Sequence, residues 1–352
     1  MSRFEIVMEK GKKVMRASLK ALSTNLLGGL LFLIANTAYG QEEFKLEMPI
    51  RCKLNSDCWI VNYVDLDPTN GIADYTCGAA TYDQHKGTDF AIINVDVMRR
   101  GVEVLASAAG IVRGTRNNMP DINVNMGGGV ASVEGKECGN GVLIDHGVGW
   151  TTQYCHMLRE SVRVKTGDTV ETGQTIGLVG LSGKTEFPHL HMQVKYNEQV
   201  VDPFAGLLRK KKCGVGEAPL WKTDALLSML YEPSALYSAG FSSTTPNKRI
   251  AREGLYGEEV LFKKSPVIAL WVDMFWVNPG DRLLFIITDP KGKTLMAHNT
   301  TIKKRRPRRF AFAGINRKKE KPWVKGAYTG EIRLTRFGEN EEYRIVKVVN
   351  VN

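Results

Sequence analysis

Short apolar runs separated by glycine-bearing turns constrain the fold of this chain most strongly. Between about residues 81 and 204 they recur as Asp89-Phe-Ala-Ile-Ile, Val102-Glu-Val-Leu-Ala, Gly110-Ile-Val-Arg and Gly141-Val-Leu-Ile-Asp. No window of this region has a good helical period, so the pattern predicts an all-β sandwich or barrel. Similar alternation returns from Leu255 to Val351 and predicts a second, smaller β-sandwich.

The other segments suggest an exported chain of several parts. Residues 1–40 resemble a signal peptide, with a basic start, the apolar run Leu26–Ala35 and small residues at Ala38-Tyr39-Gly40. The run is too short to span a bilayer comfortably, and an uncleaved anchor is the alternative. We expect a cysteine-bearing lead-in at 41–80, the first β domain at 81–205, a connector with one short helix at 206–249, and the C-terminal domain at 250–352.

The formal net charge of +11 is concentrated in the C-terminal third. Residues 246–352 carry 23 Lys and Arg against 11 Asp and Glu, whereas residues 41–245 carry 19 against 24. A basic surface suits an anionic polymer, although solvated basic faces are equally common. Export argues against nucleic acid as the partner, and the stretches Lys303–Arg309 and Arg317–Lys321 are the candidate contacts for anionic envelope polymers.

All six cysteines lie before the basic third of the chain, and an even number in an exported protein indicates disulfides. They lack Cys-x-x-Cys spacing, which argues against a structural zinc site. The pairing we expect first is Cys138 with Cys155, because their segments resemble adjacent strands. The full set is Cys52, Cys58, Cys77, Cys138, Cys155 and Cys213.

The histidines are few and grouped. His85 and Asp89 stand in His-Lys-Gly-Thr-Asp, and His189 and His191 stand in His-Leu-His on an expected strand. Residues two apart on a strand share a face, with Cα atoms about 6.6 Å apart. Imidazole and carboxylate are ligands that Zn²⁺ accepts, but the pattern leaves open which histidine of His-Leu-His would bind it. His156 ends another expected strand, and His146, at a turn, suggests a structural role.

The ordered set of motifs is similar to the lysostaphin-type (LytM) zinc endopeptidases, which cut peptide bonds in bacterial peptidoglycan. His-x-Gly-x-Asp is followed by Ile-Asp-His-Gly, Tyr-x-His, Gly-Gln-x-Ile-Gly, Gly-x-Ser-Gly and His-Leu-His across about residues 80–204. The resemblance implies a LytM-type open β-sandwich or barrel. It also implies one zinc per chain held by His85, Asp89 and His191, with His156 and His189 as the non-ligating active-site histidines.

Two further features bear on the resemblance. The segments around Cys58, Asp74 and Cys138 are similar to a cysteine-bearing subgroup from Gram-negative bacteria. Cys155, directly before His156, departs from the pattern, and a free thiol there would compete for zinc unless a disulfide holds it.

These observations predict an exported, most simply periplasmic, zinc endopeptidase that hydrolyses peptidoglycan cross-links. His189 would accept a proton from the attacking water and His156 would donate to the oxyanion, or the roles are exchanged. The alternatives are a non-catalytic regulator of other wall hydrolases, a wall-binding module with a structural metal, and a secreted peptidase acting on proteins. The mature chain is expected to have no membrane span.

Overall fold

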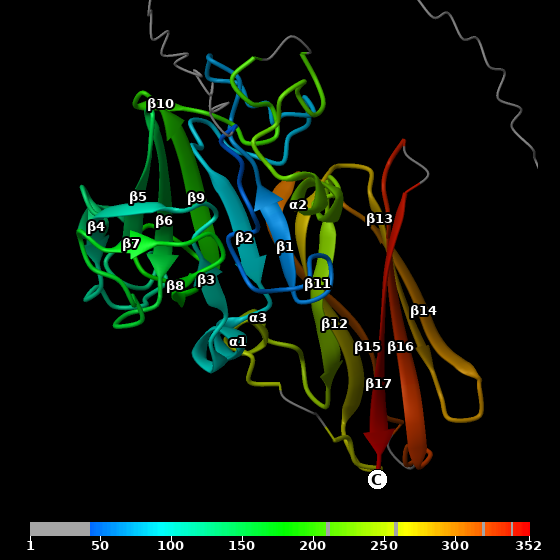
Figure 1. Ribbon diagram of the computed structural model, residues 1–352. Helices are drawn as coiled ribbons and strands as arrows, with labels where there is room; N and C mark the ends of the chain where they lie inside the picture. The colour runs from blue at the N-terminus through cyan, green and yellow to red at the C-terminus, as the bar shows by residue number, and fades with distance from the viewer. Residues whose placement is uncertain (1–42, 209–211, 257–259, 319–320, 339–340) are drawn as a thin grey trace, which may run out of the picture. The chain divides into compact units, whose positions relative to one another are not determined.

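The computed structural model describes residues 43–208, 212–256, 260–318, 321–338 and 341–352 (Figure 1). Residues Phe44–Asn352 form one compact unit. The predicted signal peptide lies outside the described residues. Within the described ranges, no helix has both the length and the apolar character needed to cross a bilayer.

The all-β prediction is confirmed. The largest sheet in the described part of the chain has the strand order β1-β2-β9-β6-β5-β4-β7, with β10 paired to β9 (Figure 1). Its members are β1 (Cys58–Asn62), β2 (Thr88–Ile92), β4 (Gly110–Arg116), β5 (Asn140–Gly147), β6 (Trp150–Met157), β7 (Thr169–Val170), β9 (His189–Tyr196) and β10 (Gln199–Val200). A separate antiparallel pair joins β3 (Glu103–Leu105) to β8 (Thr175–Leu178).

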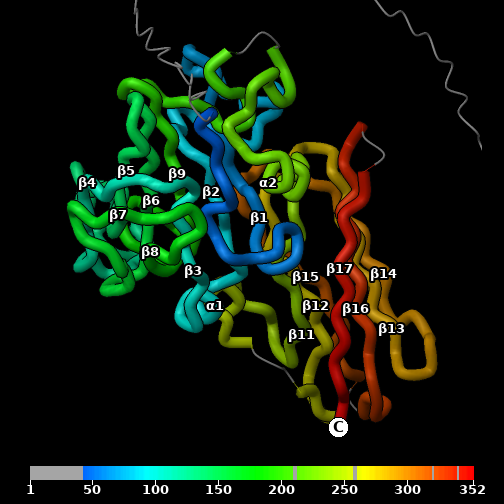
Figure 2. The backbone as a smooth tube through the Cα atoms, in the orientation of Figure 1, coloured from blue at the N-terminus to red at the C-terminus, as the bar shows by residue number. Residues whose placement is uncertain are grey.

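The lead-in contributes the edge strand of this sheet. β1 pairs antiparallel with β2, and Asn62 is in register with Asp89. Both strands are buried along their whole length, including the polar residues Asn62, Thr88 and Asp89. The described part of the expected lead-in therefore adds one strand, β1, to the same sheet as the histidine-bearing strands, as the backbone trace in Figure 2 also shows.

In the part of the chain that the structure describes, four short helical segments interrupt the strands. The one short helix expected within residues 206–249 is α2 (Thr223–Ser228). Helix α1 (Val95–Arg100) was not expected, and its first turn is capped by the Asn94 side chain, which accepts from the Val97 main-chain N–H at 2.9 Å. The others are the 3₁₀ turn Val130–Val133 and α3 (Lys248–Glu253).

The C-terminal part contains two further antiparallel sheets around a second core. One has the order β11-β12-β15 and the other β14-β13-β16-β17. Their bounds are β11 (Ala235–Ser242), β12 (Val267–Val277), β13 (Arg282–Thr288), β14 (Thr294–Thr301), β15 (Arg306–Asn316), β16 (Gly326–Thr335) and β17 (Glu342–Val351). β11 falls within residues 206–249, which the sequence suggested were a connector.

Strand β12 supplies side chains to both hydrophobic cores. Leu270, Val272 and Met274 pack in the C-terminal core, whereas Phe275 and Trp276 belong to the core of the large sheet. The indole N–H of Trp276 donates to the carbonyl of Val61 on β1. The two β regions are thus joined by packed side chains as well as by the chain itself.

Candidate metal and catalytic site

Three potential metal ligands converge at the junction of β2 and β9. Asp89 on β2 is in register with His191 on β9, and His85 approaches from the loop before β2. Asp89 Oδ1 lies 2.8 Å from His191 Nδ1 and 3.2 Å from His85 Nε2, and those two nitrogens are 3.2 Å apart. Gly87 is required here because an added Cβ would lie 2.6 Å from the His191 ring.

Two residues of the lead-in orient this trio. The carbonyl of Tyr63 accepts from His85 Nδ1 at 2.7 Å, so the neutral ring keeps its lone pair on Nε2. The side-chain amide of Asn62 donates to Asp89 Oδ2 at 2.7 Å, which leaves Oδ1 directed at the histidines. Nothing in the sequence connected Asn62 or Tyr63 with the site, because no motif links residues 41–80 to His85.

The donor set fits a small divalent metal. Tetrahedral coordination with bonds near 2.1 Å places ligand atoms about 3.4 Å apart, so the observed spacings need to open by at most about 0.6 Å. His85 and Asp89 are buried, and His191 is partly exposed. Among the described residues, the other such grouping contains Cys52 and Cys58, which are joined in a disulfide.

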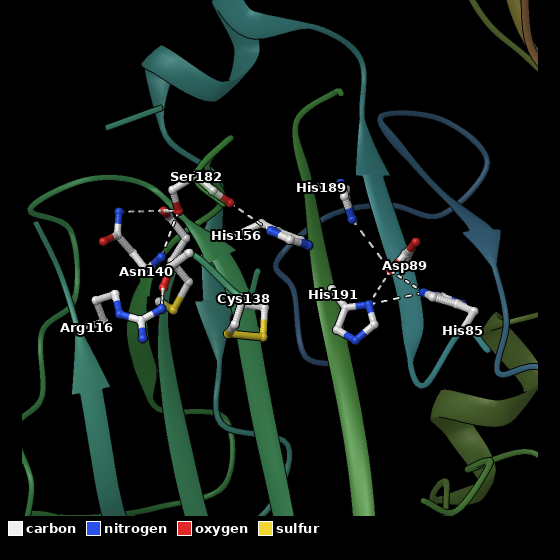
Figure 3. The surroundings of a disulfide bond; sticks show 12 residues. His85, Asp89, Arg116, Cys138, Asn140, His156, Ser182, His189 and His191 are labelled. Carbon is white, nitrogen blue, oxygen red and sulfur yellow. Dashed lines mark hydrogen bonds and ion pairs between the residues drawn. A yellow bond between two sulfur atoms is a disulfide. The ribbon is translucent and has the colours of Figure 1, made fainter. Parts of the chain in front are cut away.

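The two remaining histidines border the trio (Figure 3). His189 Nε2 is 3.6 Å from Asp89 Oδ1, and its ring centroid is 4.7 Å from that of His156 on β6. The Nδ1 of His189 donates to the carbonyl of Phe187 at 2.9 Å, and the Nδ1 of His156 donates to the carbonyl of Ser182 at 2.8 Å. Both neutral rings therefore keep the lone pair on Nε2.

Burial and neighbouring charges set the ionisation of the cluster before any metal binds. Burial lowers the pKa of His156 well below its ordinary value, and His189 and His191 reinforce that shift. Burial also lowers the pKa of His189, although Asp89 opposes it. Burial opposes ionisation of Asp89, but His85 and His189 hold its pKa well below the usual range. Near neutral pH the cluster thus contains a carboxylate beside two neutral imidazoles.

All five residues singled out in the sequence thus come together, and His146 does not. Its Nδ1 contacts the carbonyl of Ala109 at 2.7 Å and its Nε2 contacts Thr152 Oγ1 at 2.8 Å. These contacts support the structural role expected for His146.

The cysteines all form disulfides, which are Cys52–Cys58, Cys77–Cys213 and Cys138–Cys155. The expected pairing of Cys138 with Cys155 is confirmed. Cys155 is in register with His191, so a free thiol at that position would stand beside the trio. The disulfide withdraws it as a competing ligand.

The C-terminal part also reaches the site through Phe187. The Phe187 ring stacks on His189 with centroids 4.6 Å apart and packs against Phe275 of β12 at 5.4 Å. The Arg308 guanidinium lies 5.2 Å from the centre of the Phe187 ring and pairs with the buried Asp273 at 3.2 Å. These contacts between distant segments carry no signal in the sequence.

The segment that carries these residues matches a known protein family. The family model described as Peptidase family M23 matches residues 83–203, the segment that carries all five site residues. This chain contains a peptidase family M23 domain. That domain spans the strands from β2 to β10, while β1 and the C-terminal sheets lie outside it.

Several relatives share the M23 domain. The chain is 31% identical over 150 residues to peptidoglycan DD-endopeptidase ShyA of Vibrio cholerae, covering 41% of this chain and 29% of that protein. It is 33% identical over 109 residues to DD-carboxypeptidase/endopeptidase Mpg of Neisseria meningitidis, covering 29% and 25%. The chain thus spans less than a third of the length of these relatives.

Solved structures of M23 proteins also align with the chain. The catalytic domain of lysostaphin from Staphylococcus simulans aligns with a TM-score of 0.27 at 24% identity, covering 42% of this chain and 90% of that domain. A zinc-containing peptidase from Vibrio cholerae aligns with a TM-score of 0.26 at 25% identity, covering 41% and 39%.

Proposed function

We propose that this chain is an exported zinc endopeptidase that hydrolyses peptide cross-links of peptidoglycan. The observation that carries the proposal is the convergence of His85, Asp89 and His191 beside two buried neutral histidines in an M23 domain. The relatives named as peptidoglycan endopeptidases support the substrate class. Three disulfides support export, most simply to the periplasm, because such bonds persist in oxidising compartments.

In this proposal His85 Nε2, Asp89 Oδ1 and His191 Nδ1 hold the metal. When bound, zinc supplies Lewis acidity that polarises the scissile carbonyl and lowers the pKa of the attacking water. The chain's own residues move the protons. His189 accepts one at Nε2, and the Asp89 carboxylate 3.6 Å away stabilises the positive charge that develops on its ring.

His156 is proposed to stabilise the oxyanion. The Ser182 carbonyl fixes its proton on Nδ1, so donation from Nε2 requires the doubly protonated ring. Burial disfavours that form in the resting site, so His156 would take its second proton from solvent as negative charge develops on the substrate and return it to solvent when the oxyanion collapses. His189 then returns its proton to the leaving amine, which completes hydrolysis of the amide. The opposite division of roles would exchange the two histidines.

The C-terminal domain offers a basic surface for anionic envelope polymers. Lys303, Lys304 and Arg306 are exposed, whereas Arg305 donates to the Ala79 carbonyl and lies over the Trp276 ring, and Arg308 is paired with Asp273. We therefore assign the polymer contact to the exposed members of the stretch Lys303–Arg309 and a structural role to Arg308.

The test is digestion of purified cross-linked peptidoglycan by the full chain, followed by mass spectrometry of the products with and without a chelator. Chelator-sensitive loss of cross-linked dimers, restored by added zinc, is expected, and the product masses would identify the bond. A chain that binds zinc at the trio but leaves every cross-link intact would refute the peptidoglycan endopeptidase proposal. A matched sample of His189→Ala distinguishes turnover from a contaminating hydrolase.

A further inference from the structure

The disulfide Cys138–Cys155 lies at the centre of the site rather than at its edge. Cys155 directly precedes His156 on β6 and is in register with His191 on β9. Cys138 stands just before β5, in the turn that faces His156 (Figure 3). The bond thus links that turn covalently to the strand residue beside both His156 and His191.

The backbone of His156 depends on this turn. Its amide donates to the carbonyl of Cys138 at 2.7 Å. Its φ of 61° lies in the left-handed region, which a non-glycine residue occupies only when its surroundings hold it there. The register between β5 and β6 also shifts between Asn140 and Val142, so regular strand pairing does not fix His156.

The side chain of His156 is held by a second turn that interlocks with the first. The carbonyl of Ser182 accepts from His156 Nδ1. The Ser182 hydroxyl accepts from the main-chain N–H of Asn140 at 2.9 Å and donates to the Met157 carbonyl at 2.7 Å. An added Cβ on Gly139 would lie 2.4 Å from the Ser182 main chain, so the two turns are in direct contact. Displacing the Cys138 turn would therefore displace both partners of His156.

We propose that the Cys138–Cys155 disulfide is a positioning element for His156. It holds the Cys138 carbonyl and, through Asn140, the Ser182 turn, and together they aim His156 Nε2 at the space beside the His85, Asp89 and His191 trio. The inference rests on the proposed function of His156 but makes a separate claim. The bond is required for the orientation of one imidazole and not for metal binding, because the side chains of His85, Asp89 and His191 bond to Tyr63, Asn62 and one another, and not to the Cys138 turn.

The chain contains a matched control for this bond. Cys52–Cys58 is also a disulfide, and Cys58 starts the edge strand β1. Strands β2 and β9 lie between β1 and β6, which carries Cys155. The comparison therefore uses the full-length double variants C138A/C155A and C52A/C58A, each loaded with one equivalent of zinc. Four quantities are measured: bound zinc, kcat and KM on a cross-linked muropeptide, and the imidazole proton NMR signal of His156.

The NMR signal separates positioning from general damage. The Nδ1 proton that His156 donates to Ser182 is buried, so we expect it to exchange slowly with solvent and to give a resonance that reports the orientation of the ring. In C138A/C155A we expect this signal to be lost and kcat to fall at least about tenfold with KM and bound zinc retained, because a misplaced catalytic group costs on the order of 10- to 100-fold. In C52A/C58A we expect the His156 signal to be retained and kcat to stay within about twofold of the parent chain.

Each other outcome has a definite meaning. An unchanged His156 signal and an unchanged kcat in C138A/C155A would overturn the inference, as would an equal loss in the two double variants. If His156→Ala keeps full turnover, the proposed role of His156 fails, while the NMR comparison still decides whether the disulfide orients the ring. Should the alanine pair not fold, C138S/C155S preserves more of the side-chain volume and takes its place.

Discussion

Replacing Asn62 by leucine should weaken metal binding although Asn62 is not itself a ligand. The amide of Asn62 donates to Asp89 Oδ2 at 2.7 Å, and both side chains are buried. Leucine has nearly the same volume but no donor, so Asp89 would lose the contact that directs Oδ1 toward His85 and His191. Loss of such an outer partner lowers metal affinity about 10- to 100-fold, or roughly 1.4–2.7 kcal/mol of binding free energy.

The affinity is measured by competition between the full chain and a chromogenic chelator of known zinc affinity, at fixed pH. Asn299→Leu serves as the control. Asn299 is exposed on β14, and its replacement removes a side-chain amide of the same kind. A folded Asn62→Leu chain whose zinc affinity stays within about twofold of the parent would refute the reasoning, since the expected effect is at least fivefold larger. The lead-in would then contribute to stability but not to the metal site.

Further expectations concern the histidines and the C-terminal contact. His191→Ala should lose zinc and activity together in a metal assay, and activity without bound metal would contradict its place in the trio. His189→Ala should retain zinc and lose turnover. Because burial lowers the pKa of His189 below 6.5, the acidic limb of kcat/KM should lie below pH 6.5, and a limb above it would be inconsistent with a buried neutral base. Arg308→Met should leave Asp273 with one fewer cationic partner, lowering the free energy of unfolding by roughly 1–3 kcal/mol in a denaturant titration.

The sequence predicted the parts of the site that local pattern can carry. Period-two alternation gave the β class, and His-Leu-His on a strand necessarily puts His189 and His191 on one face. The pairing of Cys138 with Cys155 followed from expected strand adjacency and is confirmed by the structure.

The remaining features depend on contacts between distant segments. Asn62 reaches Asp89 only because β1 pairs with β2, and Phe275 reaches Phe187 only after β12 packs on the large sheet. Neither contact has a motif, since a buried amide or phenyl ring looks the same in any strand. The glycines around Ser182 predicted a turn, but the group that holds His156 there is a main-chain carbonyl, which every residue has.

Strand β12 limits which substitutions and domain recombinations this protein can accept. Leu270, Val272 and Met274 of this strand fill the C-terminal core, whereas Phe275 and Trp276 fill the core of the large sheet, and Phe275 touches the residue that stacks on His189. A substitution on one face shifts the strand that the other face must also fit. The M23 domain and the C-terminal region are therefore not independently exchangeable units. A recombinant that joins this M23 domain to a different C-terminal region must also supply a replacement for β12.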